Sequence, residues 1–252
     1  MIFKLEVLNI KKSYGNLDTI DDVSLKIEPN SFVSILGPSG CGKSTLFDII
    51  SGIETPDKGK VLIDKKDYTA KTGIISYMQQ KDLLFPWKNV LDNTCLPLLL
   101  RGINLNDARE KAESFFEVFG LKSFEKNYPK ELSGGMKQRA ALLRTYLFSS
   151  EIMLLDEPFG SLDAITRRRM QLWLLKIISH FNSSILFITH SVEEAIFLSD
   201  KIYLLSDRPS NVKEVFKIIL DKPRDFKTFT SKEFIKIKEE ILTKLMGDKR
   251  EF

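Results

Sequence analysis

The chain is 252 residues long, which suffices for one α/β domain with an insertion or for two modest domains. Hydrophobic residues make up 43% of it and charged residues 29%, and a net charge of +4 is too small to indicate nucleic acid as the main partner. The N-terminus alternates apolar and charged residues, and the longest apolar runs are about six residues, so we expect neither a signal peptide nor a membrane-spanning segment. Two cysteines, Cys41 and Cys95, are too few for a disulfide framework and fit a reducing compartment.

The first part of the chain has the alternating pattern of an antiparallel β piece. We expect strands over residues 2–8 and 20–27, with turns at residues 11–16 and 28–30. Tyr14, in the first of these turns, is either a platform on which a base stacks or an aromatic that covers the sheet. A buried strand is expected over residues 32–36, directly before a glycine-rich segment that opens a helix.

The glycine-rich segment, residues 37–45, reads GPSGCGKST and has the spacing G-x-x-x-x-G-K-[ST]. Its glycines let backbone N–H groups turn inward, where these groups and the positive end of the following helix can hold phosphate oxygens. We expect Lys43 to reach the β- and γ-phosphates and Ser44 to ligate Mg²⁺. With a strand before it and a helix after it, the motif predicts a nucleotide site made of Gly37, Pro38, Ser39, Gly40, Cys41, Gly42, Lys43, Ser44 and Thr45.

The position of Cys41 within this segment bears on its chemistry. A helix N-terminus and the neighbouring Lys43 both favour the thiolate form of a cysteine. The sequence therefore predicts that Cys41 is more reactive than Cys95, unless its thiol is an inert group that fills a position in the loop.

Short strands are expected over residues 60–63 and 73–78, and the pattern is helical from residue 89 to residue 148. One helix, capped by Asn106 and Asp107, has apolar residues at helical spacing as far as Phe119 and ends at Gly120. We interpret residues 88–148 as a helical insertion in an α/β core. The segment 85–87, Phe-Pro-Trp, precedes it and is expected to be a loop, with aromatics that are either tucked into the core or presented to a partner.

The α/β pattern resumes with a buried strand over residues 152–155 that ends in two carboxylates. Asp156 can orient the waters of Mg²⁺ there, beside the glycine-rich loop, and Glu157 can accept a proton from an attacking water. A helix over 164–180, a strand over 185–188, a helix from residue 192 and strands over 202–205 and 215–220 follow. From residue 231 a tail helix is expected, whose apolar stripe is Phe234, Ile237, Ile241 and Leu245.

Residues 132–139 read LSGGMKQR, so two glycines after a serine open a second helix whose start can bind an anion. A single nucleotide site in one chain needs only one phosphate-binding loop. In a pair of chains both would be used, if the second helix start of each chain completed the nucleotide site of the other. Over residues 2–220 the sequence resembles the ATP-binding cassette (ABC) family, whose signature and Walker A motifs match residues 132–136 and 37–45. The family's adenine-stacking aromatic corresponds to Tyr14, its Q-loop glutamine to Gln80, its Walker B aspartate and catalytic glutamate to Asp156 and Glu157, its D-loop aspartate to Asp163, and its switch histidine to His190.

The resemblance implies an α/β P-loop NTPase core with a mostly parallel sheet and an N-terminal antiparallel β piece, over residues 1–87 and 149–220. Residues 88–148 would form a helical subdomain and residues 221–252 a helical tail. ATP and Mg²⁺ would be the cofactors, with Ser44, Gln80 and Asp156 around the metal ion. Catalysis would depend on Lys43, Gln80, Glu157 and His190, and in a homodimer the second ATP contacts would come from Ser133, Gly134, Gly135 and Asp163.

The same resemblance implies partners and a location. The segment 85–87 and the methionine that ends the signature are typical of the nitrate/sulfonate/taurine branch of bacterial importers. Such a chain is peripheral on the cytoplasmic side of the inner membrane. It binds permease subunits, is linked only indirectly to an extracytoplasmic solute-binding protein, and binds no nucleic acid. An exporter ATPase, or a soluble ABC-type ATPase acting on DNA or ribosomes, is the alternative.

Overall fold

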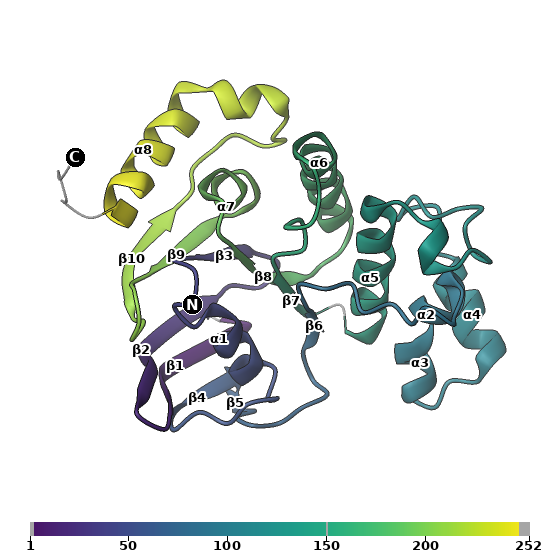
Figure 1. Cartoon of the computed structure of the whole chain (residues 1–252), viewed down its shortest axis with the longest axis horizontal. Coiled ribbons are helices and arrows are strands. Elements are labelled where there is room, and N and C mark those ends of the chain that lie inside the picture. Colours follow the sequence, from purple (N-terminus) through teal and green to yellow (C-terminus); the bar gives the residue numbers. More distant parts are fainter. Residues whose placement is uncertain (1–2, 150, 247–252) are drawn as a thin grey trace. The chain divides into compact units, whose positions relative to one another are not determined.

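The structure is a computed structural model that describes residues 3–149 and 151–246. It consists of two compact units, one made of residues 1–74 and 184–252 and the other of residues 75–183 (Figure 1). The helical insertion expected at 88–148 lies within the second unit and the tail expected at 221–252 within the first. The assignment of both segments as separate domains stays a prediction.

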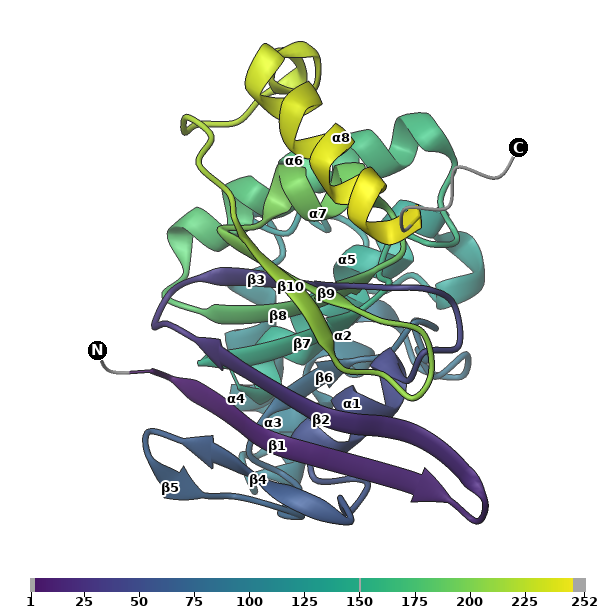
Figure 2. The same cartoon turned by 90° about the vertical axis from the view of Figure 1, so that its left-hand side faces the viewer.

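An antiparallel sheet in the first unit has the strand order β2-β1-β4-β5 (Figure 2). Its strands are β1 (Leu5–Tyr14), β2 (Leu17–Ile27), β4 (Lys58–Ile63) and β5 (Lys66–Asp67). The turn predicted at residues 11–16 is wrong in extent, because residues 11–14 continue β1 and only Gly15 and Asn16 turn. Lys11 and Lys12 lie within the strand, where Lys11 Nζ is 2.6 Å from Asp21 and Lys12 Nζ is 2.7 Å from Glu54.

The glycine-rich loop is carried by parallel strands of the first unit. Strand β3 (Phe32–Leu36) pairs in parallel with β8 (Ser184–Thr189) and β9 (Lys201–Leu205), and β10 (Val212–Lys217) pairs antiparallel with β9. Every residue of β3 and β8 is buried, as is usual for parallel strands covered on both faces. Helices α1 (Lys43–Ile50) and α7 (Val192–Leu198) follow β3 and β8. In the second unit, β6 (Ser76–Met78) pairs in parallel with β7 (Ile152–Asp156), which confirms the expected α/β class.

The second unit is otherwise helical. It contains α2 (Val90–Thr94), α3 (Leu96–Leu100), α4 (Leu105–Glu113), the 3₁₀ turn η1 (Pro129–Glu131), α5 (Gly134–Phe148) and α6 (Ala164–His180). The helix predicted over residues 106–119 is wrong at both ends. Asn104 is its N-cap and accepts a hydrogen bond from the Asp107 N–H. It ends early because the N–H groups of Phe115 and Phe116 bond carbonyls three residues back, which tightens the backbone into turns.

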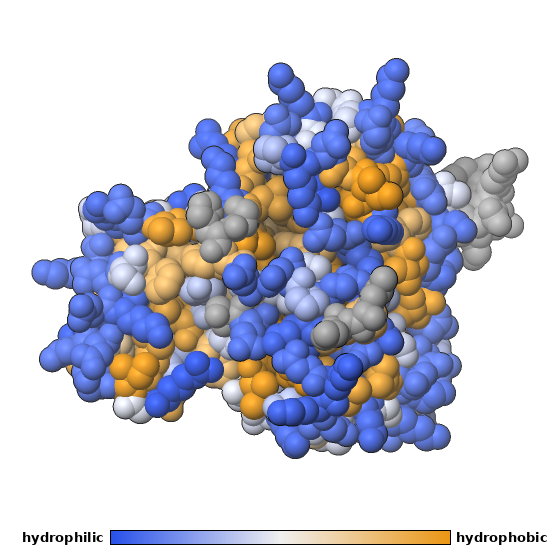
Figure 3. Space-filling model, turned by 180° about the vertical axis from the view of Figure 1, so that it is seen from behind, coloured by the Kyte–Doolittle hydropathy of each residue, from blue (hydrophilic) through white to orange (hydrophobic). Residues whose placement is uncertain are grey.

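The C-terminal segment forms the 3₁₀ turn η2 (Phe226–Thr230) and α8 (Lys232–Met246), and α8 packs on α7. Phe234 and Ile241 are buried and Ile237 and Leu245 are half-buried, so the predicted apolar stripe is confirmed. None of the helices in the described residues is both long and apolar enough to cross a membrane. On the face shown in Figure 3, hydrophilic side chains predominate and apolar side chains lie in scattered patches between them.

Candidate functional site

The glycine-rich loop is wrapped around the ammonium group of Lys43. This side chain is 6% exposed, and its Nζ donates to the carbonyl oxygens of Gly37 at 2.9 Å and Pro38 at 2.7 Å. Gly42 has φ +104°, and a Cβ there would lie 3.0 Å from Thr19 Cγ2, so glycine is required by both conformation and space. The loop is therefore a preformed turn of backbone with a positive charge at its centre.

The start of α1 provides donors for an anion. Its N-cap is Gly42, which makes no side-chain cap hydrogen bond, and its first turn holds no acidic residue. The first N–H groups of a helix have no partner within the helix and carry its positive end. Because Ser44 is exposed and Thr45 is half-buried in this turn, the backbone and hydroxyl groups together fit the polyphosphate of a nucleotide.

Burial favours the second alternative for Cys41, an inert thiol that fills a position in the loop. The side chain is 1% exposed, and burial raises the pKa of its thiol more than the positive charge of Lys43 lowers it. Burial is also the main cause that raises the pKa of the Cys95 thiol. The helix start and Lys43 alone would lower the pKa of the Cys41 thiol, but desolvation disfavours the thiolate and the pKa is raised instead.

Both cysteines are therefore expected to react slowly in the folded protein. With the pKa raised, the thiolate fraction at pH 7.5 is lower than in a free cysteine, so iodoacetamide should modify Cys41 at least ~10-fold more slowly than free cysteine. The rate should rise with pH and approach that of free cysteine after unfolding in guanidinium. Mass spectrometry of alkylated peptides measures both rates, and rapid alkylation of Cys41 at neutral pH in the folded chain would contradict its burial.

Tyr14, the last residue of β1, is 46% exposed. Lys12 Nζ lies 5.1 Å from its ring centroid, and the Lys12 ammonium is held by Glu54. Burial of the hydroxyl end and the nearby Glu54 raise the pKa of Tyr14. The ring is thus neutral and accessible, as stacking on a base requires, and its role there stays a prediction.

In the second unit, a pair of carboxylates, Asp156 and Glu157, lies at the end of strand β7. Asp156 is 6% exposed and accepts a hydrogen bond from the Tyr77 hydroxyl at 3.4 Å. Glu157 has φ +43°, a left-handed conformation that is uncommon outside glycine and that is often found where function requires it. Gln80 Nε2 donates to Glu157 Oε2 at 3.3 Å, so the structure brings the predicted Q-loop glutamine to the predicted general base.

The signature segment and the D-loop residue both begin helices of the second unit. Ser133 Oγ accepts from the Met136 N–H at 3.3 Å, and Asp163 Oδ1 accepts from the N–H groups of Ile165 at 3.1 Å and Thr166 at 2.9 Å. A hydrogen bond from the Thr166 side chain, followed by the one from the Thr166 N–H, holds the pKa of Asp163 below its usual value. The segments lie side by side, because a Cβ on Gly134 would be 3.2 Å from Leu162.

His190 is exposed at the end of β8 in the first unit, in a short link to α7. On either side of it, Thr189 Oγ1 donates to Glu194 Oε2 at 2.6 Å and accepts from the Ser191 N–H at 3.0 Å. Sequence reasoning missed Glu194. The spacing Ser-x-x-Glu at residues 191–194, which is a helix-start signal, could have found it.

The loop at residues 85–87 is confirmed, and its aromatic rings are presented outward. Trp87 is 70% exposed and Phe85 39% exposed, and their rings stack with centroids 5.1 Å apart. Asn93, which is fully buried, holds this loop. Its Nδ2 donates to the carbonyls of Phe85, Lys88 and Asn89 at 3.0–3.1 Å, and its Oδ1 accepts from the Phe85 N–H at 2.7 Å.

A second contact fixes the start of the same loop. Arg144, on α5, donates to the carbonyl oxygens of Asp82 at 2.6 Å and Leu83 at 2.8 Å. The signature helix is thus bonded to the segment between Gln80 and the aromatic pair. No sequence signal pointed to Arg144 or Asn93, because their partners are backbone atoms.

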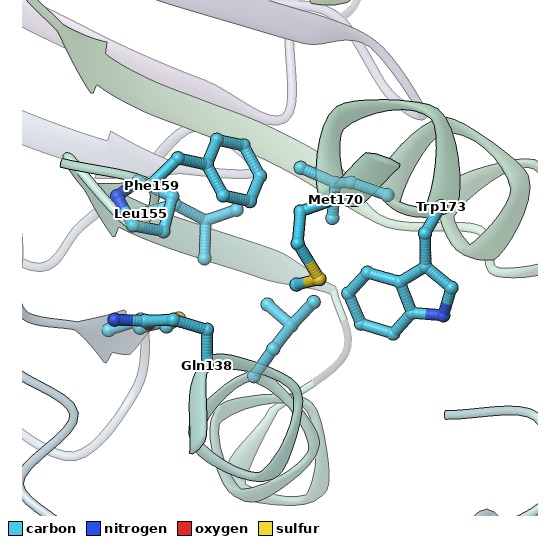
Figure 4. Close-up of a pocket in the computed structure, with 9 residues that line it drawn as sticks. Gln138, Leu155, Phe159, Met170 and Trp173 are labelled. Atoms are coloured by element: carbon cyan, nitrogen blue, oxygen red, sulfur yellow. The ribbon is translucent and has the colours of Figure 1, made fainter. Parts of the chain in front are cut away.

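A small cavity in the second unit is not part of the site. It measures about 10 Å³ and is lined mainly by apolar side chains, among them Phe159, Met170 and Trp173 (Figure 4). A cavity of roughly 10–15 Å³ holds one water molecule at most, so it has no room for a nucleotide.

The proposed Mg²⁺ ligands have suitable chemistry. Ser44 offers a hydroxyl, Gln80 an amide oxygen and Asp156 a carboxylate, and Mg²⁺ binds hard oxygen donors of these kinds. Mg²⁺ usually keeps several waters and is held by one or two carboxylates together with substrate phosphates. The donor set therefore fits a metal ion that arrives with a nucleotide.

Comparison with known proteins points to the same chemistry. Residues 20–160 match the ABC transporter family. An uncharacterized ABC transporter ATP-binding protein of Methanocaldococcus jannaschii is 43% identical, and the alignment covers 98% of this chain and 93% of that protein. The aliphatic sulfonates import ATP-binding protein SsuB of Bacillus anthracis is 37% identical, and the alignment covers 92% of this chain and 90% of that protein. A dimeric ATP-binding cassette bound to ADP and Pi, in a post-hydrolysis state, is 28% identical, with a TM-score of 0.73 over 86% of this chain and 100% of that one.

Proposed function

Because this chain belongs to the ABC transporter family, with the ATPase activity of its cassettes, we propose that it powers an importer of a small solute. The observation that carries the proposal is the loop of backbone around Lys43 at the start of α1. The likeness to sulfonate import proteins favours an importer of the nitrate/sulfonate/taurine branch, so a small organic or inorganic anion is the proposed solute class.

In this proposal the backbone N–H groups of the glycine-rich loop, those of the residues other than Pro38, bind the phosphates together with Lys43, and Tyr14 stacks on the base. Ser44, Gln80 and Asp156 would hold Mg²⁺, which would supply positive charge to neutralise the phosphates. Glu157 accepts the proton of the attacking water, and the hydrogen bond from Gln80 orients its carboxylate. His190 contacts the γ-phosphate.

Two copies of the chain are proposed to enclose two nucleotides. Each copy would present Ser133, Gly134 and Gly135, at the start of α5, and Asp163, at the start of α6, to the ATP bound by the other. The dimeric cassette with ADP and Pi supports this arrangement. ATP would then favour the closed dimer because it binds that state better, and hydrolysis would release it.

The aromatic pair is proposed to dock a permease subunit at the cytoplasmic face of the membrane. A loop held by Asn93 and Arg144 presents Phe85 and Trp87 to solvent. Exposed, preorganised aromatic side chains are the usual anchors of protein interfaces, where an amphipathic helix can lie against them. The extracytoplasmic solute-binding protein would contact the permease and not this chain.

Trp87→Ala tests the importer proposal. The variant should fold and hydrolyse ATP in isolation like the parent, because the ring is exposed and the loop is held through backbone atoms. Loss of a buried aromatic anchor costs about 2–4 kcal/mol of binding, so affinity for the permease should fall ~30-fold or more. Pull-down and solute-stimulated ATPase of the assembled transporter measure this loss.

Leu100→Ala is the matched control, because this side chain is 82% exposed on α3, away from the loop in sequence. It should leave assembly unchanged. If Trp87→Ala assembles and couples normally, the loop is no docking surface, and the exporter or soluble-ATPase alternatives return.

A further inference from the structure

The C-terminal segment of the first unit is bound to the helix that follows His190. Helix α7 is only seven residues long and begins at Val192. In Figure 1, α8 (yellow) lies next to α7, and the contacts between the two helices are direct. Three sets of contacts, at the start, side and end of α7, connect the tail to the histidine.

At the start of α7, Glu194 fixes the residues on both sides of His190. Its carboxylate accepts from Thr189 Oγ1 at 2.6 Å, its N–H donates to Ser191 Oγ at 3.3 Å, and the side chain is 6% exposed. The Ser191 N–H also bonds Thr189 Oγ1. A displacement of α7 therefore moves both residues that flank His190.

At the end of α7, Arg224 binds three backbone carbonyls. Its Nη1 donates to Phe197 and Ser199 at 2.9 Å and to Ile196 at 3.3 Å, and the side chain is buried. Ile196 and Phe197 lie in the last turn of α7, where carbonyls lack a partner within the helix and carry its negative end, and Ser199 is its C-cap, so a cation is the group that best satisfies them. Arg224 thus ties the first residues of the tail to α7.

Along the side of α7, two further contacts come from η2 and α8. The ring of Phe229 stacks on Phe197 with centroids 4.1 Å apart, and it meets the edge of Phe234 on α8 at 5.2 Å. Lys238 Nζ lies 2.7 Å from Glu193 Oε1. The central contact is the ring of Phe229, which lies between α7 and α8.

We propose that the tail, residues 224–246, is a positioning element for ATP hydrolysis, acting on His190 through α7. The proposal rests on the role assigned to His190 above. Helix α7 is short and is held at both ends and along one side, so it should move as a rigid body when the tail is displaced, because packed interiors transmit displacement. Phe229, Arg224 and Glu194 are accordingly positioning residues, and the tail should affect turnover more than nucleotide affinity.

Phe229→Ala tests the proposal, with Phe226→Ala as the matched control. Phe226 lies in the same 3₁₀ turn, but its ring is 56% exposed. Misplacement of a reacting group by about 1 Å can cost up to ~10²-fold, so we expect Phe229→Ala to lower kcat roughly tenfold. KM for ATP should change less than about twofold, because the phosphate loop is untouched. Phe226→Ala should behave as the parent.

A readout independent of activity comes from the histidines, of which the chain has two. In a ¹H–¹³C spectrum the imidazole signals are assigned with His190→Gln. The His190 signal should move in Phe229→Ala and stay in place in Phe226→Ala. A folded Phe229→Ala with normal kcat, or with lower kcat and an unmoved His190 signal, would overturn the proposal.

If Phe229→Ala fails to fold, Phe229→Leu keeps the apolar volume without the stacked ring, and the same expectations apply to it. If Glu157→Gln hydrolyses ATP normally, the proposed catalytic function fails, whereas the His190 signal still decides whether the tail acts on this residue.

Discussion

Glu157→Gln is expected to lower steady-state ATP hydrolysis by ~10²–10⁴-fold, which is the usual contribution of a positioned general base. The amide keeps the shape of the side chain, and Gln80 lies within 3.3 Å to bond its oxygen. ATP binding should therefore survive, and ATP-dependent dimers should accumulate because they form but do not reopen. Phosphate release and size-exclusion chromatography with Mg²⁺-ATP measure the two effects.

Glu151→Gln provides the control, since this exposed carboxylate lies directly before β7, the strand that ends in Asp156. Its turnover should equal that of the parent. Near-parental turnover in Glu157→Gln would remove Glu157 from the mechanism, whatever the behaviour of the control.

Lys43→Ala is expected to weaken ATP binding itself. The ammonium group lies inside the loop, and hydrogen bonds to charged groups contribute about 1.5–3 kcal/mol each, so affinity should fall ~10–10²-fold or more. The carbonyls of Gly37 and Pro38 also lose their donor, which should loosen the loop. Isothermal titration with ATP measures the loss, and circular dichroism verifies the fold.

Lys58→Ala, an exposed lysine on β4, is the charge-matched control and should bind ATP as the parent does. Since both variants lose one positive charge, a loss confined to Lys43→Ala shows that position and not net charge is responsible. Parental affinity in Lys43→Ala would mean that the loop does not bind the phosphates.

The sequence predicted the parts of the site that depend on local pattern. Lys43 and its glycines were predicted from the spacing of the loop, and Asp156 was predicted from its place at the end of an apolar strand. The element boundaries were less predictable. The end of α4 depends on three-residue backbone bonds at Phe115 and Phe116 that leave no mark in the apolar spacing.

Tertiary context explains what the sequence missed. The pKa of Cys41 follows burial, which a local view of Lys43 and the helix start does not contain. Tyr77 and Arg144 bond groups that are distant in the sequence, and the partners of Arg144 are main-chain carbonyls available in any sequence. Such residues were invisible because their side chains carry no motif.

Asn93 fixes the backbone of the aromatic loop and makes none of its amide hydrogen bonds to the aromatic side chains. All four bonds of the Asn93 amide go to main-chain atoms of Phe85, Lys88 and Asn89. The exposed side chains of Phe85 and Trp87 can therefore be substituted without a change in the backbone conformation of the loop. Under the docking role proposed for this loop, substitution of the presented side chains alone would change the permease that is bound, while Asn93 is retained.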